Sequence, residues 1–317
     1  MKNSLCLIIA YIIICLGGAL ACAALYMIYC DCTYLIAGTK IPLASQYFFL
    51  RGFFLASPVC AALAPYFMIL YMIRHVEKFF LPLIIFVALS VVSFLLLIPS
   101  LLNFGSYYDT AFVPEKVSEQ LTPGYFRSQD SSVFYYTSVH DDGTADGLQI
   151  ATRGIESTLN AITVFERQPL QKFNSEPFAD ILIAQSMPTS PLLNVLFVKI
   201  CEFVQQAFKI LQTGYFNWIC FCSMGLALIT SAAFIRATYW RLLNVLLVCI
   251  GNCAIFVFNY LCHCTQSLAS LGSFIHNLPF SSAVPYPVPF FGNVLIAIVF
   301  AVLGIIMFSV HRKGFEE

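Results

Sequence analysis

Six long apolar runs dominate the chain. Each reaches the length of about 20 residues that a helix needs to cross the hydrocarbon layer of a bilayer, and none contains Asp, Glu or Lys. The pattern predicts six transmembrane helices, three before and three after one long polar segment. Because the first run is longer than the apolar part of a signal peptide, we expect it to be a retained helix. The runs are Leu5–Tyr29, Tyr47–Ile73, Phe79–Phe104, Tyr215–Ile235, Leu242–Leu261 and Phe290–Val310.

The polar segment between the two sets of helices is predicted to be a small β domain. Ser132–Val139 and Gly147–Thr152 are rich in aromatic and β-branched residues, and His140–Gly143 between them has the composition of a tight turn. Leu159–Glu166 and Phe178–Ala184 are further strand candidates. Prolines interrupt the rest of the segment, which favours five or six short strands over long helices.

The segment ends in a predicted amphipathic helix, Leu192–Gln212. Lys199, Glu202, Gln206 and Lys209 recur at three- and four-residue steps among apolar residues. Such a helix is expected to lie at the membrane–water interface or to extend the fourth span. The predicted organisation is three transmembrane helices in residues 1–104, the β domain in 105–191, the amphipathic helix in 192–214 and three transmembrane helices in 215–317.

Composition and charge agree with a membrane protein. The 317 residues are 60% hydrophobic and only 10% charged, whereas soluble domains are about a quarter charged. Sixteen acidic residues balance sixteen basic ones, and without a large basic patch a nucleic-acid partner is excluded. Lys2, Arg74, Arg236, Arg241 and Arg312 fall on one side of the membrane if both termini are cytoplasmic. The segment between positions 105 and 214, with twelve acidic and seven basic residues, then lies outside and includes the β domain.

The sequence lacks the spacings that common catalytic sites require. There is no phosphate-binding Gly-x-x-x-x-Gly-Lys-Ser/Thr, no His-Glu-x-x-His and no Gly-x-Ser-x-Gly. We therefore expect no enzyme, no metal and no cofactor. Asp141 and Asp142 are interpreted as the solvated tip of a hairpin.

Three asparagines mark one face of the fifth span. Asn244, Asn252 and Asn259 are spaced by eight and seven residues, which places their amides on the side that should point into the bundle. One interpretation is interhelical hydrogen bonding, and the other is a polar lining for an amphipathic lipid.

Three Cys-x-Cys pairs lie near the predicted outer ends of the spans. Two residues apart on a helix, such side chains point in different directions, so a metal site is not expected. Packing is one interpretation, and disulfides in an oxidising compartment are the alternative. The pairs are Cys30 and Cys32, Cys220 and Cys222, and Cys262 and Cys264.

The layout of three helices, one outer β domain and three helices resembles the lipopolysaccharide-export permeases of the LptF/LptG type. The local likeness lies in Phe258–Leu261, Leu271-Gly272, Leu278–Phe280, Pro287 and Asn293, and in the strand–turn–strand stretch Val133–Ile150. Two features depart from that family: its Trp before Pro-Asn is absent, and only Arg74–Lys78 occupies the place of its inner segment that docks an ATPase.

The resemblance implies a fold and a function. The fold is a six-helix membrane bundle, three plus three, with an inserted jellyroll-like or partial-sandwich domain. The function is that of an inner-membrane subunit of a lipid-export ABC transporter, with a cytoplasmic ATPase and a related permease subunit as partners. An apolar groove in the outer domain would receive acyl chains, and its candidate residues are Phe134, Tyr136, Ile150, Ile162 and Val164. The alternative is a membrane anchor or sensor that does not transport and whose outer domain binds a partner protein.

Overall fold

The computed structural model describes residues 2–38, 44–75, 80–111, 123–129, 132–151, 162–169, 180–186, 190–265, 267–268 and 284–311. The chain forms two compact units. The helical unit comprises Met1–Ala21, Phe53–Tyr108 and Val195–Glu317. The sheet unit comprises Cys22–Gly52 and Asp109–Asn194.

Seven helices in the described part of the chain are long and apolar enough to cross a membrane, so the chain is a multi-pass membrane protein. All six predicted spans are among them, and the seventh is the predicted amphipathic helix. In the first half of the chain they are built from α1 (Lys2–Ile12), η1 (Ile13–Gly17) and α2 (Gly18–Ile36), then α3 (Gln46–Arg74), and then α4 (Phe80–Val92), η2 (Ser93–Leu97) and α5 (Ile98–Ala111).

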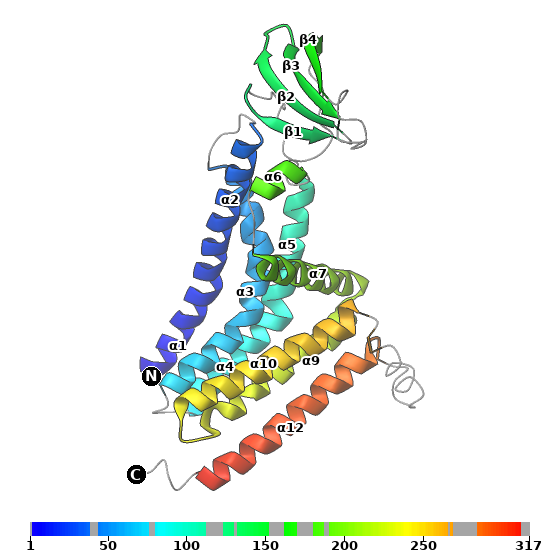
Figure 1. Cartoon of the computed structure of the whole chain (residues 1–317). Coiled ribbons are helices and arrows are strands. Elements are labelled where there is room, and N and C mark those ends of the chain that lie inside the picture. The colour runs from blue at the N-terminus through cyan, green and yellow to red at the C-terminus, as the bar shows by residue number, and fades with distance from the viewer. Residues whose placement is uncertain are drawn as a thin grey trace. The chain divides into compact units, whose positions relative to one another are not determined.

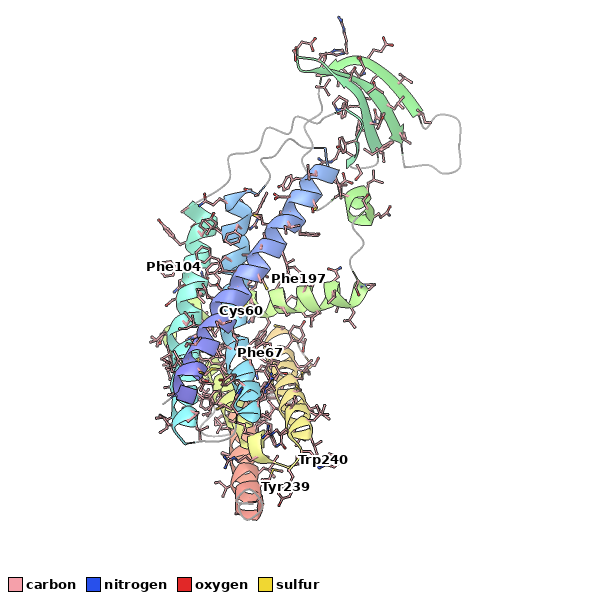
Figure 2. The ribbon with its side chains drawn as sticks, turned by 90° about the vertical axis from the view of Figure 1, so that its left-hand side faces the viewer. Cys60, Phe67, Phe104, Phe197, Tyr239 and Trp240 are labelled. Atoms are coloured by element: carbon pink, nitrogen blue, oxygen red, sulfur yellow. The ribbon has the colours of Figure 1, made fainter. Side chains whose placement is uncertain are left out.

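The second half of the chain begins with α7 (Pro191–Thr213), whose bounds differ by one residue at each end from the prediction. The part of α7 that belongs to the helical unit runs across α3 and α5 instead of alongside them (Figures 1 and 2). The remaining helices are α8 (Tyr215–Phe221), α9 (Ser223–Thr230), η4 (Ser231–Arg236), α10 (Arg241–Cys264) and α12 (Pro287–His311).

Two apolar cores hold the helical unit together. One joins α1, α3, α4, η4 and α10 through buried residues such as Leu7, Met68 and Phe86. The other joins α3, η2, α5 and α7–α10 around Trp218, which is fully buried. Because lipid tails are as apolar as these side chains, close packing and interhelical hydrogen bonds must stabilise the assembly.

The π-helical segment η2 shows how such hydrogen bonds arise. A π-turn frees backbone carbonyls, which must find donors when no water is present. The carbonyl oxygen of Phe94 accepts the indole N–H of Trp218 at 2.9 Å and the thiol of Cys222 at 3.3 Å. The next carbonyl, that of Leu95, accepts the Tyr215 hydroxyl at 2.9 Å. Two side chains of α8 and that of Cys222, the residue directly after α8, thus donate hydrogen bonds to the free carbonyl oxygens of η2.

The sheet unit contains a four-stranded antiparallel sheet in the order β1-β2-β3-β4 (Figure 1). Its strands are β1 (Phe126–Gln129), β2 (Ser132–Val139), β3 (Thr144–Ala151) and β4 (Ile162–Pro169). The predicted hairpin at His140–Gly143 is present: Gly143 has a φ of +78°, and the His140 N–H donates to the Thr144 carbonyl at 2.8 Å. The described residues therefore form one sheet of four strands, whereas the sequence predicted five or six.

One strand prediction was wrong. Of Phe178–Ala184, the first two residues lie outside the described residues, and all those after Asp180 belong to the helix α6 (Ile181–Ser186). Asp180 caps this helix, because its Oδ1 accepts the Leu182 N–H at 3.0 Å. The same carboxylate accepts the Nε–H of the buried Arg127 at 3.2 Å and the Ser128 N–H at 2.9 Å. Asp180 therefore fastens α6 to β1, a strand that the sequence did not predict.

Candidate functional site

An apolar cavity of about 440 Å³ lies inside the helical unit. Such a volume falls in the range of sites that bind small organic molecules, about 300–1,000 Å³. Its lining comes from α3, η2, α5 and α7–α10 and is almost wholly apolar. The lining residues are Pro58, Val59, Ala62, Leu63, Phe94, Ile98, Leu102, Leu196, Lys199, Ile200, Phe203, Val204, Ala207, Phe221, Met224, Phe256, Val257 and Tyr260.

The two ends of α7 differ, and this difference shapes the cavity. Near its C-terminal end, Ala207 and Ile210 are buried in the core around Trp218. Nearer its N-terminal end, Leu196 and Phe197 are each 53% exposed, and Leu196 also lines the cavity. The helix is therefore packed firmly at one end and leaves apolar space beneath the other.

Three polar side chains, those of Lys199, Glu202 and Tyr260, interact with one another at the edge of this apolar cavity. Lys199 Nζ donates to both carboxylate oxygens of Glu202, at 3.2 and 3.0 Å, and lies 5.7 Å from the centre of the Tyr260 ring. The Tyr260 hydroxyl donates to Glu202 Oε2 at 2.6 Å. Lys199 and Tyr260 line the cavity, whereas Glu202 does not. The site thus combines an apolar interior with one cation and one hydroxyl at its rim, which is the pattern of an amphiphile-binding site.

The three asparagines of α10 are all buried, and each makes hydrogen bonds. Asn259 and Asn293 of α12 exchange two amide hydrogen bonds, at 2.9 and 2.8 Å. Asn252 accepts the Ser231 hydroxyl at 3.2 Å. Asn244 instead holds the turn before α10, where its amide donates to the Ile235 and Thr238 carbonyls. None of the three is among the described residues that line the cavity, so the geometry favours packing over a lipid lining.

The six cysteines of the Cys-x-Cys pairs all lie among the described residues, where each is a free thiol. Cys30 and Cys220 are buried, and the other four are partly buried. Cys222 donates to the Phe94 carbonyl, as described above. The described residues also contain no cluster of three or more His, Cys, Asp or Glu side chains that could hold a metal.

The five predicted groove residues lie on two opposite faces of the sheet. Phe134 and Tyr136 are buried in a small core with Ala145 and Phe165, where Tyr136 meets Phe165 edge to face. They therefore cannot line the same groove as the other three predicted residues. The prediction treated apolar positions on separate strands as equivalent, but only the register fixes which face each one occupies.

Ile150, Ile162 and Val164 occupy the other face of the sheet. Val133, Ile150 and Ile162 are paired across β2, β3 and β4, and the neighbouring row is Tyr135, Leu148 and Val164. Ile162 is 64% and Val164 68% exposed. Val133, Tyr135, Leu148 and Ile150 are partly buried, and Phe126 of β1, paired with Tyr135, is 51% exposed, so seven apolar side chains share this accessible face.

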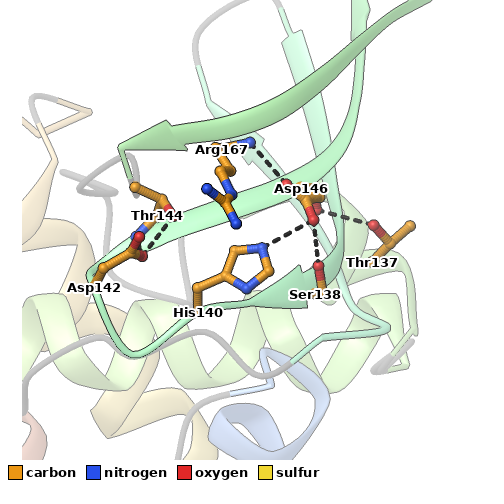
Figure 3. A network of polar contacts seen from close by, with 7 residues as sticks. All are labelled: Thr137, Ser138, His140, Asp142, Thr144, Asp146 and Arg167. Carbon is orange, nitrogen blue, oxygen red and sulfur yellow. Dashed lines mark hydrogen bonds and ion pairs between the residues drawn. The ribbon is translucent and has the colours of Figure 1, made fainter.

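Asp146 organises the end of the sheet near the hairpin turn (Figure 3). The pairing of β3 with each neighbour is irregular at this point. Asp146 Oδ1 accepts the Arg167 N–H at 2.7 Å, where Arg167 has a φ of +50°. Its Oδ2 accepts the Ser138 hydroxyl at 2.8 Å and lies 2.9 Å from His140 Nε2. These bonds lower the pKa of Asp146 to about 2, and the Arg167 N–H has the largest effect.

Asp142 lies at the predicted hairpin tip and is exposed. It accepts the Thr144 N–H at 2.9 Å and the Thr144 hydroxyl at 2.5 Å, which lowers the pKa of its carboxyl group. The two aspartates thus shape the hairpin, which is a structural role.

The sequence did not predict the cavity, although the polar stripe of α7 contained a signal for it. The stripe included Lys199 and Glu202, but Tyr260 lies 58 residues further along the chain from Glu202. Parts of the segments behind the family resemblance lie outside the described residues, including Leu271-Gly272, Leu278–Phe280 and most of Arg74–Lys78.

The chain matches no protein-family model and no curated protein sequence.

Proposed function

We propose that this protein binds an amphipathic membrane lipid in the cavity under α7 and passes it towards the sheet unit, as a permease-like subunit. The observation that carries the proposal is the apolar cavity of about 440 Å³ with Lys199 and Tyr260 at its rim. An apolar interior takes an acyl chain, because burial of each CH₂ group stabilises the complex by about 0.8 kcal/mol. The polar rim keeps the headgroup hydrated or hydrogen-bonded.

A cavity-filling substitution tests the binding step. Ala62 is partly buried and lines the cavity, so Ala62→Phe should occupy the space of the acyl chain. Ala301 lies exposed on α12, outside the cavity, and Ala301→Phe is the matched control. After purification in detergent and a wash that removes loosely bound lipid, native mass spectrometry should show bound lipid on the wild type and the control and none on Ala62→Phe. Equal retention by all three proteins would contradict the proposal.

The apolar face of the sheet supports the second step. Its two rows of apolar side chains offer a surface on which acyl chains can lie once they leave the bundle. A photoreactive residue at Ile162 or Val164 should crosslink to lipid in cells. Thr163 is also exposed but lies between them on the opposite face, so it is the matched control. Crosslinks only to protein from Ile162 and Val164 would favour the alternative, a membrane anchor whose outer domain binds a partner protein.

A transporting subunit of this kind would work with a cytoplasmic ATPase and a related permease subunit. The support is the three-plus-three layout and its resemblance to the lipopolysaccharide-export permeases. Affinity purification of the full chain from crosslinked cells should recover an ATPase subunit. Recovery of the chain without an ATPase would remove the transport part of the proposal and leave lipid binding.

We further propose that the protein lies in the inner membrane with six spans, both termini in the cytoplasm and the sheet unit in the periplasm. The basic residues near the predicted inner helix ends support this orientation, and α7 is the least apolar of the seven long helices and runs across α3 and α5. Fusions of green fluorescent protein to either terminus should both fluoresce. If α7 is a seventh span, the termini lie on opposite sides and only one of the two fusions will fluoresce.

A further inference from the structure

Of the two charged side chains at the cavity rim, only the cationic one lines the cavity. Among the described residues that line the cavity, Lys199 alone carries a formal charge. Its partner Glu202 is outside the lining, and both carboxylate oxygens of Glu202 are already engaged by Lys199 and Tyr260. A ligand in the cavity therefore meets an ammonium group and a phenol, while the carboxylate that balances the charge is next to them, 42% exposed and outside the lining.

We infer that the cavity selects a lipid with an anionic phosphate headgroup, and that Lys199 binds the phosphate. This inference rests on the proposed lipid-binding function. The Lys199 side chain is 47% exposed, so a headgroup can reach its ammonium group without unfolding α7. An ammonium group has three N–H donors, and Glu202 and the Tyr260 side chain already engage them, so a phosphate oxygen must share or replace one of these contacts. An amine in the headgroup would be repelled by Lys199.

Glu202 has the opposite effect on the same ligand. It competes with the phosphate for the Lys199 ammonium group, and its negative charge lies close to the headgroup position. Tyr260 weakens this competition because its hydroxyl donates to Glu202 Oε2. Neutralising Lys199 should therefore weaken binding of the anionic lipid, and neutralising Glu202 should strengthen it. If the ion pair were purely structural, both substitutions would change the affinity in the same direction.

The test measures binding of phosphatidylglycerol and phosphatidylethanolamine with identical acyl chains to the delipidated full-length protein, by native mass spectrometry. The wild type should prefer the anionic phosphatidylglycerol. Lys199→Gln should weaken phosphatidylglycerol binding by about tenfold, the contribution of one hydrogen bond to a charged group, and leave phosphatidylethanolamine nearly unchanged. Glu202→Gln should strengthen phosphatidylglycerol binding. Lys209→Gln is the matched control, because Lys209 is an exposed lysine of α7 outside the cavity.

The outcomes separate the two proposals. If both lipids bind the wild type equally and none of the variants changes their ratio, the headgroup inference is wrong while lipid binding stands. If Glu202→Gln weakens the binding of phosphatidylethanolamine, the site recognises a zwitterionic headgroup and the inference is overturned. If neither lipid binds the wild type, the proposed lipid-binding function itself fails.

Discussion

The indole N–H of Trp218 donates to the carbonyl oxygen of Phe94 at 2.9 Å, and this bond joins α8 to the π-helical segment η2. Phe94 also lines the cavity. The segment η2, whose free carbonyl needs a hydrogen-bond donor from another helix, therefore forms part of the cavity wall. Phe221, which stacks on Trp218, also lines the cavity, so the core around Trp218 supports part of the cavity wall.

Loss of this donor should destabilise the helical unit. Trp218→Phe keeps an aromatic ring at this position but removes the N–H and part of the buried ring volume, and Cys222 still donates to the Phe94 carbonyl. We expect the lost hydrogen bond to lower the free energy of unfolding by roughly 1 kcal/mol, as for other interhelical hydrogen bonds in membranes, and the lost ring volume to add to that cost. The double variant Trp218→Phe, Cys222→Ala should lose more than the sum of the single variants. Thermal unfolding in detergent checks this, and strictly additive losses would show that the two donors act independently.

Gly225 of α9 provides the space for the Phe94 ring. A Cβ atom at Gly225 would lie 2.7 Å from two atoms of that ring, which is closer than van der Waals contact permits. Gly225→Val should therefore push the ring into the cavity or out of the core, at a cost of about 1–3 kcal/mol. The expected results are a lower melting temperature and reduced lipid retention. Unchanged stability and retention would mean that the ring has other space available.

Asp146 should stabilise the sheet in a pH-dependent way. Its pKa is about 2 in the folded protein and 3.8 ordinarily, so its stabilising contribution is complete above about pH 4 and is lost as the pH falls through about 2. Asp146→Ala should make residues 126–169 more susceptible to pepsin at pH 4, while the difference from the wild type should be much smaller near pH 2, where about half of the Asp146 carboxyl groups are protonated. Asp141→Ala, in the exposed turn nearby, is the control. A difference as large at pH 2 as at pH 4 would argue against a role of the ionised carboxylate.

Trp240 should report the membrane boundary. It is 77% exposed and lies with Tyr239 on the turn before α10 (Figure 2). Tryptophan and tyrosine are enriched at membrane–water interfaces, and Asn244 fixes this turn through hydrogen bonds at both ends of its amide. In Trp218→Phe, Trp240 is the only remaining tryptophan. Its fluorescence in nanodiscs should be quenched by lipids brominated near the headgroup. Quenching by aqueous iodide alone would place the turn in water.

The transmembrane helices could be predicted closely from the sequence because length and hydropathy alone define them. The predicted amphipathic helix Leu192–Gln212 matches α7 to within one residue at each end. The paired strands β2 and β3 were also predicted, since aromatic and β-branched residues flank a turn with glycine at positive φ. These are local properties, so they can be predicted from short stretches of the sequence.

The remaining features depend on contacts between distant residues. The short helix α6 begins after Asp180, which caps it. The apolar residues on both sides of Asp180 favoured a strand, so the cap was not predicted. The two faces of the sheet could not be assigned, because irregular pairing beside Thr137 and Asp146 shifts the register. The cavity depends on the crossing of α7 over other helices, and its polar group joins Glu202 to Tyr260 of α10. A local sequence pattern does not predict a contact between residues that are so far apart in the chain.

The most direct test is site-specific photocrosslinking in delipidated detergent micelles supplied with one phospholipid. A photoreactive residue at Phe203, which lines the cavity, should crosslink to the lipid. The same residue at Phe104, which is 62% exposed and outside the cavity, should not crosslink once the bilayer is gone. A saturable crosslink at Phe203 that Ala62→Phe abolishes would establish a lipid site beneath α7. Equal crosslinking at both positions, or none at Phe203, would contradict it.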